Sequence, residues 1–272
     1  MSDNPRRTLS ERESYLLSSL SAAGFTAFSI EDARQVATIE DAALRKLLHR
    51  LSRKGWLKSL ERGKYLIIPL AAGPAGQWAE HEYLIAAALT SPYYLAYATA
   101  LHYYGYSDLP LDPVTIAVTR PKRPVVIDGL TYRFVRVKQP EFFGYEPISI
   151  AGGTVQMAER EKAVVDAFSR PDLVKGVLEA AKGVYYGRTE LDLEKVIAYS
   201  LRLSNKTASR RLGFWLELLG VGDDSMWSQL EDDRGHSYAR LEPAGGADGA
   251  YNTRWRLIVN IPDRQLLEWR EH

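Results

Sequence analysis

Apolar residues recur at helical spacing in consecutive segments near the N-terminus. The first segment predicts a helix from Thr8 to Gly24, with Thr8 and Glu11 as a capping box and the glycine as a left-handed end. A second, shorter helix is predicted from Ser29 to about residue 37, because Ser29 and Asp32 repeat the spacing of a hydroxyl followed by an acid. Both helix starts therefore carry local signals in addition to the apolar period.

The third helix shows the clearest division between an apolar and a polar side. It is predicted from Thr38 to Lys54, again with an acid, Asp41, three residues after the hydroxyl. Two strands, 56–60 and 64–68, follow with a tight turn between them. Three helices followed by a two-stranded hairpin predict a winged helix-turn-helix. The apolar stripe of the third helix consists of Leu44, Leu47, Leu48 and Leu51.

The remainder of the chain alternates between helical and strand patterns. A linker is expected over 71–79, which contain two glycines and a proline, and an interrupted helix over 80–104. Strands are then predicted at 114–118, 125–127, 132–137, 148–150 and 154–157, and helices at 158–168, 172–183, 190–203 and 206–219. Further strands are expected near residues 238 and 255, and a short final helix after residue 262. The expected fold class is α+β: a winged helix-turn-helix over 1–70, followed by a larger mixed α/β domain over 80–272 that has a subdivision near 170–204.

The composition is that of a globular protein. With 272 residues, of which 46% are hydrophobic and 25% charged, the chain can bury a sizeable core. It has no cysteine, which excludes disulfides, thiolate zinc sites and cysteine nucleophiles and fits a reducing compartment. The start of the sequence is polar and no apolar run approaches about 20 residues, so we expect neither a signal peptide nor a membrane span. The expected location is the cytoplasm.

The charge is distributed unevenly although the net charge is only +1. Residues 1–68 carry twelve Lys and Arg against eight Asp and Glu, whereas the remaining residues carry twenty-three against twenty-six. From 45 to 64 there are eight cations, and Glu61 is the only acid. This asymmetry predicts that the N-terminal segment meets a polyanion.

The basic segment is interpreted as a DNA-binding surface. An isolated basic helix is more often a solvated face, but here the cations continue from the third helix into the hairpin, where a winged helix meets DNA. The candidate DNA-binding residues are Arg45, Lys46, His49, Arg50, Arg53, Lys54, Lys58, Arg62 and Lys64. Arg45 is suited to bind guanine, and Glu40 or Asp41 to accept from cytosine, although Asp41 is equally suited to a capping role. The hairpin cations would contact phosphates.

A second basic cluster covers residues 120–138, where Asp128 is the only acid. A solvated loop and strand face is the simpler interpretation, and an extended surface for DNA, RNA or an acidic partner is the alternative. The second candidate nucleic-acid contact consists of Arg120, Lys122, Arg123, Arg133, Arg136 and Lys138.

The sequence assigns no catalytic residue, metal site or cofactor. Glu159, Glu161, Lys162 and Asp166 invite a metal-dependent nuclease interpretation. Glu159, Lys162 and Asp166 share a helical side, but their spacings are equally those of intrahelical ion pairs. The five histidines form no zinc signature, and there is no phosphate-binding loop. The tyrosines between 93 and 106 are expected to belong to the core, with a nucleotide-stacking pocket as the alternative.

Four segments, in this order, resemble AbiEi-type antitoxins, which are regulators from type IV toxin–antitoxin systems. They are LLHRLSRKGWLKSLERGKYLIIP (47–69), YYLAYATALHYYGYSDLP (93–110), TVQMAEREKAVVDAF (154–168) and ASRRLGFWLELLG (208–220). The tail after about residue 221 matches nothing in that pattern. The third segment looks structural in the family, anchoring its helix to the sheet.

The resemblance implies a DNA-binding autorepressor that also acts as an antitoxin. Its partners would be double-stranded operator DNA and a nucleotidyltransferase-like toxin, which such antitoxins oppose without a stable complex. A single basic winged helix usually needs a second copy for specific affinity, so inverted-repeat operators with a homodimer or cooperative monomers are expected. The alternatives are a nuclease or toxin-modifying enzyme that uses the 159–166 segment, and a ligand-sensing transcriptional regulator.

Overall fold

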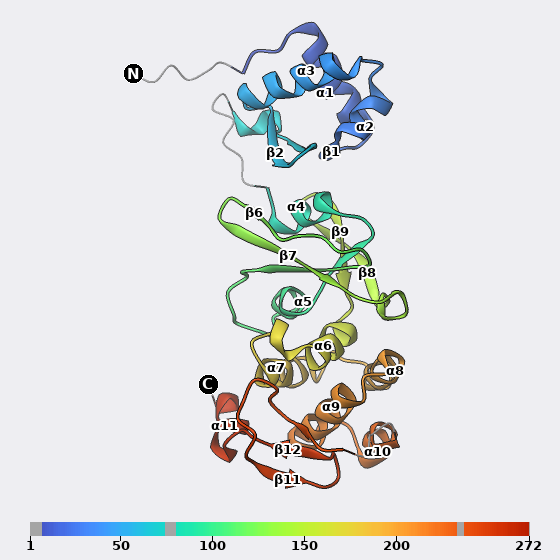
Figure 1. Ribbon diagram of the computed structural model, residues 1–272, viewed down its shortest axis with the longest axis vertical. Coiled ribbons are helices and arrows are strands. Elements are labelled where there is room, and N and C mark those ends of the chain that lie inside the picture. The colour runs from blue at the N-terminus through green and yellow to red at the C-terminus, as the bar shows by residue number, and fades with distance from the viewer. Residues whose placement is uncertain (1–6, 74–79, 233–236, 272) are drawn as a thin grey trace, which may run out of the picture. The chain divides into compact units, whose positions relative to one another are not determined.

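Helices and strands alternate along the whole chain, which makes this an α+β protein (Figure 1). The computed structural model describes residues 7–73, 80–232 and 237–271. The chain divides into two units, Met1–Ser91 with Ile150–Gly153, and Pro92–Ser149 with Thr154–His272. Residues 74–79 of the predicted linker lie outside the described residues. No helix in the described ranges combines the length and the apolar character that crossing a lipid bilayer requires.

The first unit packs helices against a small antiparallel sheet. Its helices are α1 (Glu11–Ala22), α2 (Ile30–Val36), α3 (Asp41–Arg53) and α4 (Glu82–Leu89), with a 3-10 turn at Leu70–Ala72. Its strands are β1 (Ala27–Ser29), β2 (Leu57–Glu61) and β3 (Lys64–Ile67), in the order β1-β3-β2. The predicted helices and hairpin are confirmed. The strand β1 was not predicted, because three residues are too few to show an alternating pattern.

The core of the first unit consists of the leucines that the helical period selected. Leu44, Leu48 and Leu51 of α3 are completely buried, and Leu16 and Leu20 of α1 are completely buried beside them in the same cluster. Burying a leucine side chain contributes roughly 2 kcal/mol. The apolar stripe therefore fixes which side of α3 faces inward, and with it the side that faces solvent.

Two of the three predicted helix caps are wrong. The capping box of α1 is formed by Ser10 and Glu13 instead of Thr8 and Glu11. Both pairs have the required spacing, but only Glu13 is buried and also pairs with Arg50 and Lys54 at the end of α3. The third helix has Glu40 at its N-cap with no side-chain hydrogen bond, so the expected start at Thr38 is not used. The capping box of Ser29 with Asp32 is confirmed.

A six-stranded sheet forms the centre of the second unit. Its order is β6-β7-β5-β4-β9-β8, with β5 parallel to β7 and β4 parallel to β9. The strands are β4 (Tyr93–Leu95), β5 (Val114–Val118), β6 (Val125–Ile127), β7 (Leu130–Arg136), β8 (Tyr145–Ile150) and β9 (Gly153–Ala158). All the strands predicted between 114 and 157 are present. The one missing from the prediction, β4, lies between β5 and β9.

The expected interruption of the 80–104 helical region near Ser91 and Pro92 is confirmed, but the residues that follow it form a strand before the helix resumes. The chain forms α4, then the strand β4, then α5 (Ala98–Tyr103). Pro92 disfavours the helical conformation of the residue before it, and Tyr93, Tyr94 and Leu95 are all buried as central strands require. A short, fully apolar segment has no period that separates a buried strand from a buried helix, which is why the sequence pattern failed here.

Below the six-stranded sheet in the view of Figure 1, a group of helices continues into the C-terminal part of the chain. They are α6 (Arg160–Ser169), α7 (Val177–Gly187), α8 (Leu193–Leu203), α9 (Lys206–Leu219), α10 (Asp224–Asp232) and α11 (Asp263–Leu267). A second sheet, of order β10-β12-β11, follows α10 with strands β10 (Ala239–Arg240), β11 (Ala250–Asn252) and β12 (Leu257–Val259). The helix α10 was not predicted.

A buried ion pair connects α6 to the six-stranded sheet. Lys162 and Asp166, one turn apart on α6, are 1% and 3% exposed and pair with each other. Both also reach the hydroxyl of Tyr94 on β4, Lys162 by donating at 3.1 Å and Asp166 by accepting at 3.4 Å. Burial raises the pKa of Asp166, and Lys162 and Tyr94 offset only part of that cost. These contacts have the anchoring character that the resemblance implied.

Two adjacent arginines of α9 hold the C-terminal sheet. Arg210 donates to the carbonyl of Ser237 at 2.6 Å, and Arg211 donates to the carbonyl of Leu241 at 3.0 Å. Burial lowers the pKa of the Arg211 guanidinium to about 10. Gly213 is required one turn on, because a Cβ there would lie 2.1 Å from a ring atom of Trp255. The ASRRLG segment is thus explained by packing.

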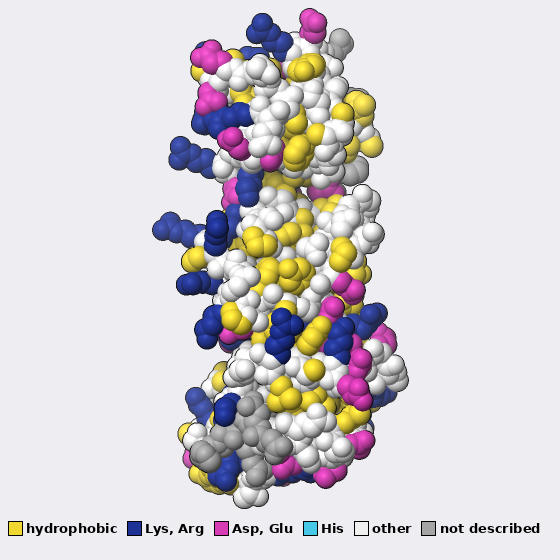
Figure 2. All heavy atoms as spheres, turned by 90° about the vertical axis from the view of Figure 1, so that its right-hand side faces the viewer, with side chains coloured by type: hydrophobic (Ala, Val, Ile, Leu, Met, Phe, Trp, Pro, Cys, Tyr) yellow, Lys and Arg dark blue, Asp and Glu magenta, His cyan; other side chains and the backbone are white. Residues whose placement is uncertain are grey.

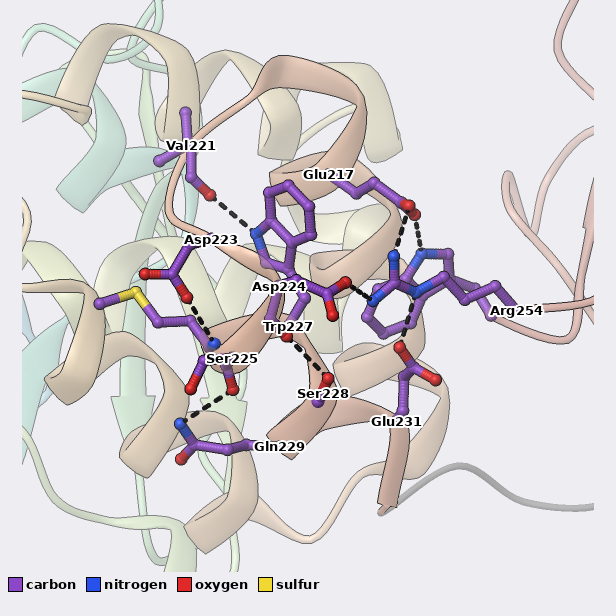
Figure 3. A network of polar contacts seen from close by, with 12 residues as sticks. Glu217, Val221, Asp223, Asp224, Ser225, Trp227, Ser228, Gln229, Glu231 and Arg254 are labelled. Atoms are coloured by element: carbon purple, nitrogen blue, oxygen red, sulfur yellow. Dashed lines mark hydrogen bonds and ion pairs between the residues drawn. The ribbon is translucent and has the colours of Figure 1, made fainter.

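Arg254 joins α9, α10 and the turn before β12. Its guanidinium lies among three carboxylates, Glu217 at 2.7 Å, Asp224 at 2.6 Å and Glu231 at 2.6 Å (Figure 3). The indole N–H of Trp255 donates to the second oxygen of Glu217 at 2.5 Å. The three carboxylates raise the pKa of Arg254, so this cation is part of the architecture.

The buried pair on α6 gives the first prediction. Replacing Asp166 alone by leucine leaves Lys162 buried without a counter-ion and should lower the free energy of unfolding by about 3–5 kcal/mol. The triple variant Asp166→Leu, Lys162→Met, Tyr94→Phe removes every polar partner and should recover most of that loss. Urea unfolding of both variants measures the difference. A triple variant as unstable as the single one would show that the charges themselves hold α6 in place.

Candidate nucleic-acid interface

The outward side of α3 carries a row of small and basic residues. Ala42, Lys46, His49 and Arg53 follow at spacings of four, three and four, and all four are exposed. They lie opposite Leu44, Leu47, Leu48 and Leu51, which are buried. We call these four residues the outer row. Ala42 carries no charge, so the charge pattern of the sequence did not indicate it, although the buried stripe already specified its side.

Five of the nine predicted DNA-binding residues are exposed without a side-chain partner among the described residues. They are Arg45, Lys46, His49, Arg53 and Arg62. Arg62 lies in the turn between β2 and β3, where Gly63 adopts φ +81°. A cation without a carboxylate partner can neutralise a phosphate and release its counter-ions. Four of these five residues, Arg45, Lys46, Arg53 and Arg62, are cations and therefore remain candidates for contact with a polyanion.

Two other predicted residues are engaged by a buried acid. Glu13 of α1 is 1% exposed and accepts from Lys54 at 2.7 Å and from Arg50 at 3.4 Å. Lys54 and Arg50 lie at the C-terminal end of α3, so the carboxylate fixes that end against α1. Burial opposes ionisation of Glu13, but the hydrogen bonds from Lys54 and Ser10 outweigh it and lower its pKa to about 2.

The hairpin cations are also partly occupied. Lys64 donates to the carbonyl of Leu89 at 2.5 Å and pairs with Glu61 at 3.3 Å. Leu89 is the last residue of α4, and a lysine there satisfies one of the free carbonyls of a helix end. Lys58 is half-buried on β2 and is not without an interaction partner in the protein. The hairpin therefore presents Arg62 more fully than Lys58 or Lys64.

The acids at the start of α3 differ in their partners. Asp41 accepts from Arg34 of α2 through both oxygens, at 2.7 Å and 2.6 Å. Glu40 is exposed at the N-cap. Asp41 is thus held by an arginine instead of being presented to a base, and the capping role that was the alternative is not observed either.

The second basic cluster lies on the β5–β7 part of the six-stranded sheet. Arg133 and Arg136 are exposed on β7, and Arg120 and Arg123 are exposed in the loop between β5 and β6. Lys122 lies over the ring of Phe134 at 5.0 Å, and Lys138 pairs with Glu141 at 3.6 Å. Figure 2 shows Lys and Arg side chains projecting along one margin at the level of this sheet. Arg133 and Arg136 are three residues apart on β7 and therefore lie on opposite faces of the sheet.

The carboxylates of the 159–166 segment are neutralised by lysines. Glu159 and Glu161 accept from Lys195 at 3.1 Å and 3.2 Å, and Asp166 is paired with Lys162. Glu159 is the N-cap of α6, so it does not share the helix with the others as expected. Among the described residues no group of three or more acidic or histidine side chains is arranged to hold a metal ion.

The tyrosines between 93 and 106 lie mostly in the core. Tyr93, Tyr94, Tyr97 and Tyr106 are between 0% and 8% exposed. Burial raises the pKa of Tyr106 to about 12, with a smaller contribution from Glu190. The expectation that this segment packs in the core is therefore confirmed for these four residues.

The fold and the exposed cations define an α+β protein with a candidate polyanion-binding face. No protein-family model and no curated protein matches the chain. Among solved structures, the crystal structure of the RV2827C protein from Mycobacterium tuberculosis is similar over 100% of this chain and 98% of that chain, with a TM-score of 0.68 and 18% sequence identity. At this identity the similarity concerns the fold alone.

Glu13 gives the second prediction. Because its folded pKa of about 2 lies below the value of about 4.3 for an unfolded chain, its contribution to stability is present above pH 4.3 and is lost as the pH falls toward 2. Glu13→Gln should lower the free energy of unfolding by roughly 2 kcal/mol at pH 7, and the difference from wild type should vanish near pH 2. Thermal unfolding across this pH range measures it.

Glu11→Gln is the matched control, since Glu11 is exposed in the same helical turn. It should change stability by less than about 0.5 kcal/mol at every pH. A pH-independent loss in Glu13→Gln would contradict the assignment of the low pKa to this residue.

Proposed function

We propose that α1–α3 and the β2–β3 hairpin, within residues 1–70 of the first unit, form a winged helix-turn-helix and that the protein is a DNA-binding transcriptional autorepressor. The observation that carries the proposal is the outer row of α3, whose cations are exposed and unpaired within the described residues while the opposite side is buried. A three-helix unit with a β-hairpin after its third helix has the element order of a winged helix. In such a unit the third helix enters the major groove.

The proposed contacts divide into two kinds. Lys46 and His49 lie in the middle of the outer row, and Arg45 lies beside them, so these side chains would approach base edges. Arg53, near the end of α3, and Arg62, in the hairpin turn, would contact phosphates and set the register. Arg50, Lys54 and Lys64 would contribute by holding the helix and the hairpin in place.

The second basic cluster is proposed as a separate nucleic-acid contact of the second unit. Its four exposed arginines favour a polyanion over a neutral partner. Specific binding by a single winged helix is weak, so two copies on an inverted repeat, as a homodimer or as cooperative monomers, form part of the proposal. A regulator of this kind would act in the cytoplasm.

The antitoxin role rests on the resemblance of four sequence segments to AbiEi-type antitoxins. Under this proposal the protein opposes a nucleotidyltransferase-like toxin without forming a stable complex with it. No catalytic step is assigned to the chain. The enzymatic alternative gains no support from α6, because its carboxylates are neutralised by Lys162 and Lys195. The ligand-sensing alternative gains none from the tyrosines that lie in the core.

DNA binding gives the third prediction. The affinity for a duplex that covers the region upstream of its own gene should fall by orders of magnitude between about 50 and 200 mM salt. The double variant Lys46→Ala, Arg53→Ala should weaken binding and reduce the slope of log K against log salt by about 0.9, because one phosphate contact, that of Arg53, is lost. Fluorescence anisotropy at several salt concentrations measures both quantities.

The control removes two positive charges elsewhere. Arg12 and Arg264 are exposed on α1 and α11, and their double alanine variant should keep the wild-type slope. Equal slopes in the two double variants, or a wild-type affinity that does not depend on salt, would contradict the assigned surface.

The antitoxin role gives the fourth prediction. Co-expression with the proposed nucleotidyltransferase-like toxin should restore growth, and the two proteins should not co-purify, because no stable complex is proposed. A chain without residues 1–91 cannot separate the roles, since Ile150–Gly153 belong to the same unit. The Lys46→Ala, Arg53→Ala variant separates them instead: it should lose operator binding and still restore growth. Failure of the wild-type protein to restore growth would rule out the antitoxin role and leave the repressor role standing.

A further inference from the structure

The start of α3 is tied to α2 by one arginine. Arg34 of α2 donates to both oxygens of Asp41, from Nε at 2.7 Å and from Nη2 at 2.6 Å, and its Nη1 pairs with Glu31 at 2.5 Å. Asp41 is the first residue of α3. A two-point contact between a planar guanidinium and a carboxylate fixes orientation as well as distance. This pair therefore links the orientation of α2 to that of the first turn of α3, beside the apolar packing of Ala33 and Leu44 in the core.

Other side-chain constraints on this end of α3 are few. The N-cap residue, Glu40, makes no side-chain capping bond, in contrast to the caps of α1 and α2. The first leucine of the buried stripe, Leu44, comes one turn later, where its amide donates to the carbonyl of Glu40 at 2.8 Å. The far end of α3 is held separately by Glu13. Arg34 thus acts on the turn that carries Ala42, the first member of the outer row.

Because the pair is exposed, its effect on the geometry of α3 can be measured apart from its effect on the stability of the fold. The side chains of Arg34 and Asp41 are 33% and 59% exposed. Exposed ion pairs contribute little to the free energy of folding, even when they fix a local geometry. Removing the pair should therefore leave the fold intact while it loosens the first turn of α3.

We infer that Arg34 is a positioning residue for DNA recognition, which orients the first turn of α3 through Asp41 so that Ala42 and Lys46 face the base edges. This inference rests on the proposed function. Ala42 is small and apolar, the kind of side chain that contacts a thymine methyl group or allows close approach to the groove. A change of a few degrees at this turn displaces Ala42 and Lys46 relative to the bases, but it leaves the phosphate contacts of Arg53 and Arg62 in place.

The test compares Arg34→Met, Arg34→Lys and Asp41→Asn with an Arg12→Met control, Arg12 being an exposed arginine of α1. The first readout is the affinity for the upstream duplex divided by the affinity for a scrambled duplex of equal length. All three variants should lower this ratio about tenfold, since one poorly read base pair costs a factor of this order. Arg34→Lys should not restore the wild-type affinity ratio, because one ammonium cannot bind both carboxylate oxygens in a plane.

Two further measurements distinguish positioning from a direct contact or a general loss of structure. The salt slope of Arg34→Met should equal that of wild type, whereas a lost phosphate contact would reduce it by about 0.9. The double variant Arg34→Met, Asp41→Asn should behave like either single variant, because both changes break the same pair. Thermal unfolding midpoints should stay close to that of the Arg12→Met control.

Hydrogen exchange without DNA keeps the inference separate from the proposed function. The amides of residues 44–48 should exchange faster in Arg34→Met and Arg34→Lys than in wild type, and at the wild-type rate in Arg12→Met. If the wild-type protein binds no DNA, the proposed function fails. Unchanged hydrogen exchange in Arg34→Met would show that the Arg34–Asp41 pair does not hold the first turn of α3. With DNA binding established, an unchanged specificity ratio or a reduced salt slope in Arg34→Met overturns the positioning role.

Discussion

The candidate interface depends on one buried carboxylate. Glu13 is enclosed between α1 and α3, where an ionised acid is stable only if its oxygens are hydrogen-bonded. Lys54 and Arg50 supply the positive charge and the backbone amide of Ser10 supplies a further donor, so the acid caps its own helix and holds the end of α3. If this contact were lost, the leucines would still be buried, but the rotation and tilt of α3 would be less well defined.

The same principle recurs in the second unit, where several charged side chains serve the architecture. Lys162 and Asp166 connect α6 to the central strand β4, and Arg211 satisfies carbonyls of the C-terminal sheet. Each of these side chains is buried and forms hydrogen bonds within the protein, so it is not available to bind an external partner. Burial and pairing therefore sort the cations of this protein into those that build the fold and those that remain available to a polyanion.

This sorting limits what a count of charges can say about the interface. The sequence predicted nine DNA-binding residues, and the structure leaves five of them exposed without a side-chain partner in the described part of the chain. Arg50 and Lys54 differ from Arg53 only in the direction in which they leave the helix, and Glu13, which selects them, is 37 and 41 residues away. Ala42 belongs to the outer row although it carries no charge.

The sequence by itself determined the positions of α1, α2, α3 and the β2–β3 hairpin, because their apolar period and turn residues are local signals. It also determined most strands of the six-stranded sheet, which have β-branched residues between turns. Only the tertiary structure decided that Tyr93–Leu95 is a central strand, that Ser10 rather than Thr8 caps α1, and which cations face solvent. These outcomes depend on partners distant in the sequence, such as β5 and β9 around β4 and Lys54 beside Glu13, and no local pattern records them.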